Sequence, residues 1–124
     1  MLARNGLTYA DIGLWEIHEA FAAQVLSHIA AWESAKFVGD KAGVTTPMGA
    51  FPRDRMNPNG GSLALGHPFG ATGARILSQT VKELAARPKG ERAIVSICAD
   101  GGQGTMNVPE RLMRKARPDS TGVD

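Results

Sequence analysis

The sequence predicts an α/β domain with a mixed sheet and helices packed on it. Short apolar runs of strand length occur at residues 12–17, 93–98 and 105–108, and stretches with helical period lie between the first two. The order is helix end, strand, helix, loop, helix, strand, strand. Alternation of this kind favours an α/β layer with a mixed sheet.

The first third of the chain contains a helix end, a turn, a strand and a helix. Residues 1–5 are interpreted as the end of a helix stopped by Gly6, because glycine accepts the left-handed backbone that closes a helix. Residues 8–11 suit a capped turn, and residues 12–17 have strand character. From Ala20 onward apolar residues recur at steps of three and four, which predicts a helix with this stripe in the core. The stripe consists of Phe21, Val25, Ile29 and Trp32.

The middle of the chain is predicted to be a long loop followed by a second helix. Glycine and proline interrupt residues 33–59, so this stretch is interpreted as loop with one short helical turn, and loops of this length are usually functional. The glycine-dense residues 57–73 lead into a helix that ends at Pro88 and Gly90. The predicted buried face of that helix consists of Ala74, Leu77, Val81 and Leu84.

The last two apolar runs are predicted to form a hairpin. Residues 93–98 are too short for a core helix and are interpreted as a buried strand. Residues 105–108 are expected to pair with this strand in the antiparallel direction across the turn at residues 99–104.

Composition excludes several classes of function. The net charge is +2, and no basic run alternates with aromatic residues, so nucleic acid is not an expected partner. The phosphates of a nucleotide cofactor are still compatible with this charge. Cys98 is the only cysteine and cannot form an intrachain disulfide. The chain shows no signal peptide and no apolar stretch of about 20 residues, so we expect no membrane span and a reducing, cytoplasmic location.

Reactive side chains occur where strands end or helices begin, which is where α/β sheets bind ligands. They are His18 with Glu19, His67, and Cys98. His67 directly precedes a helix whose first N–H groups and dipole would stabilise an anion or thiolate, and imidazole exchanges protons near neutral pH. The alternative is that His67 only caps the loop.

Cys98 ends an apolar strand just before a glycine-rich turn, where a ligand is able to approach the backbone closely. The alternative is an inert core cysteine, since most lone cysteines are of that kind. The glycines of the turn, which include Gly101 and Gly102, would then serve only a tight hairpin.

Four motifs occur in one order along the chain. They are His-Glu-Ala-Phe at 18–21, Asn-Pro-Asn-Gly-Gly at 57–61, Gly-His-Pro at 66–68 and Cys-Ala-Asp-Gly-Gly-Gln-Gly at 98–104. In order and spacing they resemble the thiolase family. Besides His18, His67 and Cys98, the residues that carry the resemblance are Glu19, Asn57, Gly66, Pro68, Gly101 and Gly102.

The resemblance implies an acyltransferase that moves an acyl group between coenzyme A and an enzyme cysteine, in 3-ketoacyl-CoA thiolysis or acetoacetyl-CoA formation. In thiolases a cysteine of the N-terminal half is acylated. The Gly-His-Pro histidine, here His67, activates that cysteine and helps to form an oxyanion hole. The C-terminal cysteine, here Cys98, shuttles protons.

Two departures from the commoner family pattern affect the expected oxyanion holes. His18 replaces an asparagine that holds an oxyanion-hole water, and this variant resembles the branch that contains the trifunctional-enzyme β-subunits of fatty-acid β-oxidation. We therefore expect His18 to line the oxyanion hole. Asp100 replaces a glycine whose backbone N–H contributes to another oxyanion hole, and it retains that N–H.

The resemblance also implies boundaries and partners. We expect a thiolase-like C-terminal domain at residues 1–109, truncated at its N-terminal side, and a charged, disordered tail at residues 110–124. Coenzyme A is expected as substrate, with no permanently bound cofactor and no metal.

Because no second cysteine is present, this chain alone is expected to be inactive and to need an N-terminal thiolase half. The full enzyme is expected to be a homo-oligomer, with a β-oxidation multienzyme complex as a further partner. The alternative function is a non-catalytic acyl-CoA-binding, lipid-binding or assembly module on the same scaffold.

Overall fold

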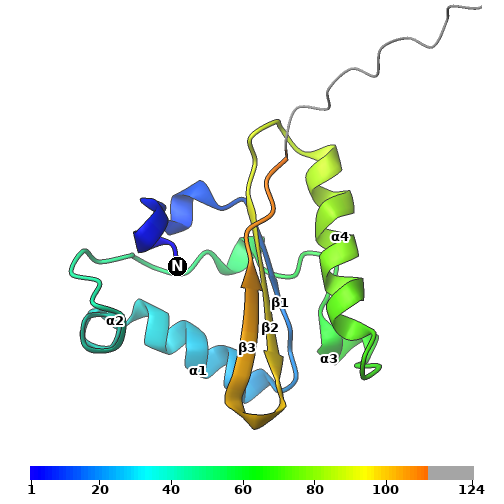
Figure 1. Ribbon diagram of the computed structural model, residues 1–124, viewed down its shortest axis with the longest axis horizontal. Helices are drawn as coiled ribbons and strands as arrows, with labels where there is room; N and C mark the ends of the chain where they lie inside the picture. Colours follow the sequence, from blue (N-terminus) through cyan, green and yellow to red (C-terminus); the bar gives the residue numbers. More distant parts are fainter. Residues whose placement is uncertain (112–124) are drawn as a thin grey trace, which may run out of the picture.

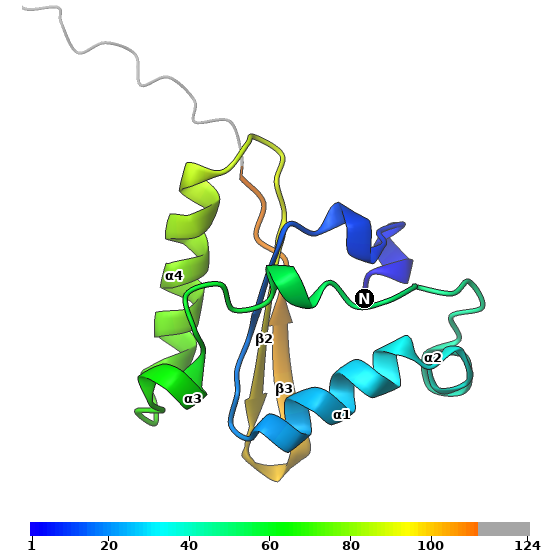
Figure 2. The same cartoon turned by 180° about the vertical axis from the view of Figure 1, so that it is seen from behind.

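The computed structural model describes residues 1–111 and shows three layers. A central sheet is covered on one face by helix α1, with α2 at the far end of α1, and on the other face by α3 and α4 (Figures 1 and 2). The α/β class with a mixed sheet is therefore confirmed. Residues 112–124, which make up most of the predicted tail, lie outside the described residues. None of the described helices is both long enough and apolar enough to cross a bilayer.

The sheet has three strands in the order β1-β2-β3, with bounds Leu14–Ile17, Ala93–Ala99 and Gln103–Asn107. Strand β1 runs parallel to β2, and β2 runs antiparallel to β3, which confirms the predicted hairpin. Glu110 forms an antiparallel bridge with Arg92, and the backbone of Arg111 bonds to residues 90 and 91. The paired chain thus includes the first two residues of the predicted tail.

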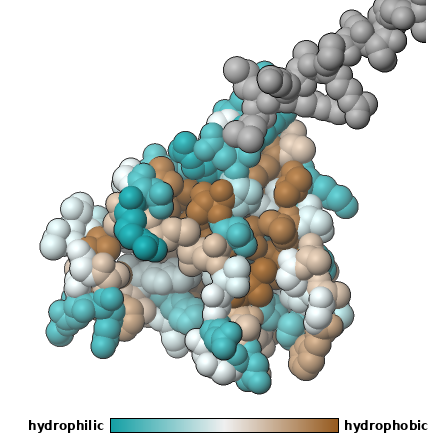
Figure 3. All heavy atoms as spheres, viewed as in Figure 1, coloured by the Kyte–Doolittle hydropathy of each residue, from teal (hydrophilic) through white to brown (hydrophobic). Residues whose placement is uncertain are grey.

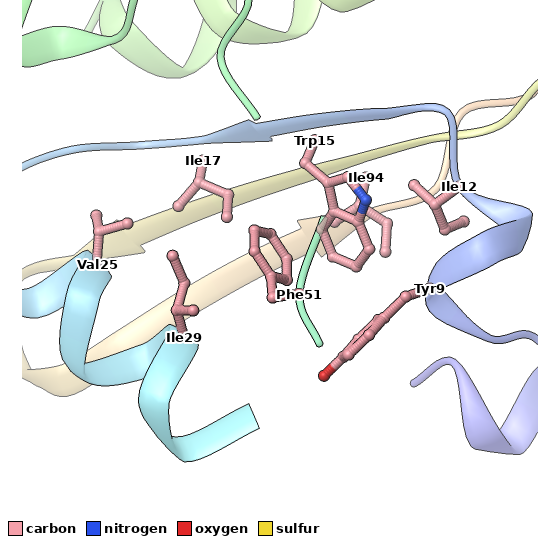
Figure 4. Close-up of a cluster of buried hydrophobic side chains, with 8 residues drawn as sticks. All are labelled: Tyr9, Ile12, Trp15, Ile17, Val25, Ile29, Phe51 and Ile94. Carbon is pink, nitrogen blue, oxygen red and sulfur yellow. The ribbon is translucent and has the colours of Figure 1, made fainter. Parts of the chain in front are cut away.

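The main apolar core lies between the sheet and α1 (Ala22–Glu33). Ile17 points from β1 toward Val25 and Ile29 of α1, whereas Trp15, with Ile94 beside it, points toward Phe51 and Tyr9 (Figure 4). Phe51 and Tyr9 complete this cluster. The rings of Trp15 and Phe51 meet edge to face with centroids 4.8 Å apart, an arrangement that the aromatic quadrupole favours. On the opposite face Leu14 and Ala93 pack with Leu84.

The predicted first helix is confirmed, but one member of its stripe was wrong. Val25 and Ile29 are buried, and Trp32 packs partly buried against them. Phe21 precedes the helix in extended conformation and is 72% exposed. The turn to helical geometry comes after Phe21, so the four-residue step from Phe21 to Val25 does not place both side chains on one face.

The predicted loop at residues 33–59 contains a helix that the sequence reading missed, α2 (Ala35–Ala42). Ser34 caps its start by accepting the N–H of Phe37, and Gly43, at φ 64°, closes its end in the left-handed region. The expected helical turn is the 3-10 helix Arg53–Arg55. Two further 3-10 helices, Ala3–Asn5 and Tyr9–Asp11, match the helix end and capped turn expected near the N-terminus.

Helix α4 (Thr72–Ala86) follows the single turn α3 (Ser62–Leu65), and its buried face differs from the predicted one. The residues that face the sheet are Thr72, Ile76, Thr80 and Leu84. Of the predicted face only Leu84 is buried. Ala74 is exposed, Leu77 is 40% exposed and Val81 is 54% exposed. The surface seen in Figure 3 accordingly presents apolar side chains over the sheet and toward α4.

One side chain completes the hydrogen bonding of β1, which is one of the two outer strands of the described sheet. The N–H of Asn57 donates to Trp15 O (2.8 Å). The side chain of Asn57 then accepts the N–H of Ile17 (2.8 Å) and donates to Ile17 O (2.9 Å). Asn57 therefore satisfies backbone groups that a fourth strand would otherwise satisfy.

Replacing Asn57 by alanine is expected to lower the free energy of unfolding by about 3 kcal/mol, because the buried N–H and C=O of Ile17 lose their partners. Asn57 has φ 46°, so a residue without a locally bonding side chain is also disfavoured there. Denaturant unfolding of Asn57→Ala measures the change. Asn59→Ala, which removes an exposed bond to Glu83, is the matched control and should stay within about 0.5 kcal/mol. Equal effects of the two variants would contradict the role of Asn57.

Candidate active site

One end of the sheet carries an open groove of about 910 Å³. The end of β1, the start of α1, the β2–β3 turn and the segment before α4 meet at this end (Figures 1 and 2). The groove brings together candidate residues from three of the four motif regions, and the region that does not line it is Asn57–Gly61. Its lining includes His18, Phe21, Gln24, His67, Cys98 and Asp100.

His18 directly follows β1 and is only 5% exposed. Its N–H donates to Ser96 O (2.8 Å), so the residue is fixed by the sheet. Ring atom Nδ1 lies 2.9 Å from the hydroxyl of Ser62, and Arg75 donates to the same hydroxyl (3.1 Å). Burial lowers the pKa of His18, and the nearby His67 and Arg75 lower it further against the opposing charge of Glu19. The imidazole is therefore held in the neutral form.

His67 is exposed, and its ring centroid lies 4.3 Å from that of His18. Atom Nδ1 is 2.7 Å from Thr72 Oγ1, and this hydroxyl donates its proton to Pro68 O (3.1 Å). With its only proton used, Thr72 accepts a hydrogen bond from Nδ1–H of His67. Atom Nε2 of neutral His67 is left without a proton and is able to accept one.

The segment between His67 and helix α4 forms a hydrogen-bonded turn. The N–H groups of Ala71 and Thr72 both donate to Pro68 O, at 3.1 Å each. A closed turn therefore separates His67 from the first turn of α4. The imidazole of His67 lines the groove.

Cys98 is partly buried on β2 and faces the groove, which argues against an inert core cysteine. Its sulfur donates to Gln24 Oε1 at 3.9 Å, a long contact typical of a weak S–H donor. A side chain with this exposure is able to exchange a proton with a bound molecule.

The glycines of the turn after Cys98 are consistent with both interpretations, a tight hairpin and a close approach of a ligand. Gly101 and Gly102 have φ 73°, so the tight hairpin requires them, and both also line the groove. The carboxylate of Asp100 is exposed and accepts the N–H of Gly101 (2.8 Å). Its charge is therefore directed at its own turn.

The remaining motif residues stand behind the groove and fix its shape. The carboxylate of Glu19 accepts from the Asn57 side chain (2.7 Å) and from Leu63 N–H (3.2 Å). A Cβ at Gly61 would lie 2.2 Å from Glu19 Oε2, so only glycine allows this approach. Gly66 has φ 92°, and Pro68 supplies the carbonyl that holds Thr72. These contacts hold the segment before α4 against the end of β1.

The sequence reading missed four polar residues around the site, namely Glu16, Gln24, Ser62 and Arg75. Glu16 is 2% exposed on the α4 side of β1, and burial raises its pKa to about 7, helped by Glu83 and opposed by Arg75. The only signal in the sequence was an acidic residue inside an apolar run. Among residues 1–111 no three His, Cys, Asp or Glu side chains gather as a metal site would require.

Comparisons with known proteins give one family. Residues 1–111 match the family model described as thiolase, C-terminal domain. The chain is 47% identical over 109 residues to a 3-ketoacyl-CoA thiolase of Aeromonas salmonicida, covering 88% of this chain and 25% of that protein. It is 43% identical over 110 residues to the mitochondrial trifunctional enzyme subunit beta of Rattus norvegicus, covering 89% and 23%.

Solved structures agree with this match. The peroxisomal 3-ketoacyl-CoA thiolase of Saccharomyces cerevisiae aligns with a TM-score of 0.59 at 34% identity, over 86% of this chain and 25% of that one. Acat5 thiolase from Ascaris suum in complex with coenzyme A aligns with a TM-score of 0.63 at 32% identity, over 90% and 24%. The chain thus spans about a quarter of the length of these relatives.

The raised pKa of Glu16 predicts a pH-dependent stability. In the unfolded chain the pKa is 4.5, and in the folded chain about 7. The contribution of the protonated carboxyl is therefore complete below pH 4.5 and is lost as the pH rises through 7. Glu16→Gln stays neutral at every pH. As the pH rises from about 5 to about 8, the unsubstituted chain should therefore lose about 1 to 3 kcal/mol of unfolding free energy relative to Glu16→Gln.

Urea unfolding at the two pH values measures this difference. His18 contributes in the opposite sense, because its lowered pKa makes the folded state less stable as the pH falls below 6.5. That contribution is common to both proteins and cancels in the comparison. A difference between the two proteins that is the same at both pH values would show that Glu16 is ionised in the folded chain.

Proposed function

The chain belongs to the thiolase family, and on this premise we propose that it supplies the histidine and the acid/base cysteine of a thiolase-type acyltransferase. The observation that carries the proposal is the shared groove. His67 and Cys98 are 31 positions apart in the sequence and line one cavity together with His18. A single thioester in that groove would meet a proton acceptor, a proton donor and an oxyanion donor.

In the proposed cleavage of a 3-ketoacyl-CoA, a cysteine from outside this chain is the nucleophile. Neutral His67 takes the proton of its thiol at Nε2, and the resulting thiolate attacks the keto carbon. The bond between the keto carbon and the α carbon then breaks. The electron pair stays on the α carbon as the enolate of acetyl-CoA, and the thiol of Cys98 protonates it.

The second half of the cycle restores both groups. A new coenzyme A thiol loses its proton to the Cys98 thiolate and attacks the acyl-cysteine. The shortened acyl-CoA leaves, and the nucleophile regains its proton from His67. A thiol suits this exchange because its ordinary pKa of about 8.5 is close to neutrality.

Oxyanion stabilisation is assigned to His18 and to the turn after Cys98. Preorganised donors at the developing negative charge supply much of the rate enhancement in acyl transfer. His18 is fixed by the sheet and faces the groove, which suits this role. The backbone N–H of Asp100 is the second proposed donor. Its carboxylate accepts the N–H of Gly101.

Coenzyme A is the proposed substrate, since the aligned Ascaris suum thiolase was solved with it. The similarity to a trifunctional enzyme subunit beta supports fatty-acid β-oxidation and a multienzyme partner. An N-terminal thiolase half and a homo-oligomer are further proposed partners, with residues 1–109 as the C-terminal domain. A reducing compartment such as the cytoplasm suits Cys98, which must remain a free thiol.

Thiolysis of a 3-ketoacyl-CoA by this chain together with the N-terminal half of a bacterial 3-ketoacyl-CoA thiolase tests the proposal. Activity should require both halves. It should fall by about 100-fold or more in His67→Ala and in Cys98→Ser, because each variant removes a proton-transfer group. Lys36→Ala, on the exposed side of α2, is the control and should keep full activity.

Two outcomes would contradict the acyltransferase role. The first is full activity in both site variants. The second is acyl-CoA binding, measured by calorimetry, that persists in both variants without turnover in any mixture of halves. That second result would favour a non-catalytic acyl-CoA or lipid-binding module on the thiolase scaffold.

A further inference from the structure

A buried hydroxyl and a guanidinium lie directly behind His18, and none of the proposed proton transfers uses them. Ser62 is the first residue of α3 and is 6% exposed. Arg75 lies on the first turns of α4. Both converge on one oxygen, Ser62 Oγ, at 2.9 Å from His18 Nδ1 and 3.1 Å from Arg75 Nη2.

Counting donors at this oxygen fixes the direction of each hydrogen bond. A guanidinium only donates, so Ser62 accepts from Arg75. In the described part of the chain the hydroxyl proton of Ser62 has no acceptor other than His18 Nδ1. If Nδ1 carried a proton instead, two donors would point at Ser62 and its own buried proton would be unsatisfied, at a cost comparable to a lost hydrogen bond. Nδ1 of His18 therefore accepts.

The neighbouring His67 is arranged in the opposite way. Its hydroxyl partner, Thr72, has its proton committed to Pro68 O and accepts from Nδ1–H. The two rings, 4.3 Å apart, thus meet two hydroxyls with opposite donor and acceptor directions. For a neutral imidazole, a proton on one nitrogen leaves the other bare.

We propose that Ser62, oriented by Arg75, is a positioning residue that holds His18 in the tautomer with its proton on Nε2. This inference rests on the proposed function, because it specifies how His18 becomes an oxyanion donor. In residues 1–111 Nε2 of His18 has no hydrogen-bond partner, and the residue lines the groove. The N–H at Nε2 is then available to a ligand, while His67 presents a bare nitrogen.

The fold positions Ser62 for its hydrogen bond to His18 Nδ1. Glu19 and Asn57 tie residues 57–63 to the end of β1, and Leu63, next to Ser62, is one of the tied groups. Arg75 also acts on the protonation of His18, since its positive charge lowers the pKa of His18 after burial and His67. A neutral ring with a fixed tautomer follows from the two contacts together.

The tautomers are directly measurable by long-range ¹H–¹⁵N NMR of the full chain labelled at histidine, which has three imidazoles. We expect the proton on Nε2 in His18 and on Nδ1 in His67. In Ser62→Ala the ratio of the two tautomers of His18 should shift toward the Nδ1–H form by about fivefold or more, because the donor to Nδ1 is lost. His67 should not change.

Matched variants separate positioning from a general structural effect. Ser62→Thr keeps the hydroxyl and should restore the tautomer of His18. Thr72→Val should alter His67 and leave His18 unchanged. Arg75→Met removes the donor that orients the Ser62 hydroxyl and should shift His18 in the same direction as Ser62→Ala, so it decides the question if Ser62→Ala does not fold.

A proton on Nδ1 of His18 in the unsubstituted chain would overturn the proposal. An unchanged tautomer in both Ser62→Ala and Arg75→Met would do so as well. The measurement needs neither coenzyme A nor turnover, so failed thiolysis with the expected tautomers would refute the proposed function alone. Active thiolysis with the opposite tautomer would refute only the positioning role.

Discussion

The side chain of Asn57 is the contact on which the geometry of the site depends. Strand β1 is one of the two outer strands of the described sheet, and a strand edge carries backbone groups that need partners. Asn57 satisfies those of Ile17, and the same amide holds Glu19. Glu19 in turn accepts the N–H of Leu63. The segment that leads to α4 is therefore fixed to the end of β1, which brings His67 against His18.

The strands were predictable because their signal is local. The runs at residues 93–98 and 105–108 are short, apolar and separated by glycines, and the hairpin follows from that spacing alone. The buried face of α4 was not predictable in this way. It contains Thr72 and Thr80, which an apolar pattern excludes. Thr80 is fully buried because its hydroxyl donates to Ile76 O (2.9 Å) within the helix, so its polarity is satisfied locally.

The candidate site was likewise predictable only in part. His18, His67 and Cys98 were found because four motifs resemble one family, and the structure places all three in one groove. Ser62 and Arg75 gave no such signal. The contact of Ser62 with His18 depends on the approach of segments 44 positions apart in sequence, and a serine at the start of a short helix normally suggests only a cap. The hydrogen-bond donors to Ser62 Oγ can be counted only when the positions of His18 and Arg75 are known.

The pairing of two histidines has a wider chemical consequence. The buried imidazole of His18, near a guanidinium, is disfavoured as a cation, so its function at this site comes from a neutral ring. A neutral ring offers one donor and one acceptor, and the nitrogen bound to the protein determines which of them faces the groove. Two identical side chains thus obtain different roles from their hydroxyl partners. A change at position 62 or 72 would exchange a donor for an acceptor while both histidines stayed in place, so the division of roles is set by residues that do not touch the substrate.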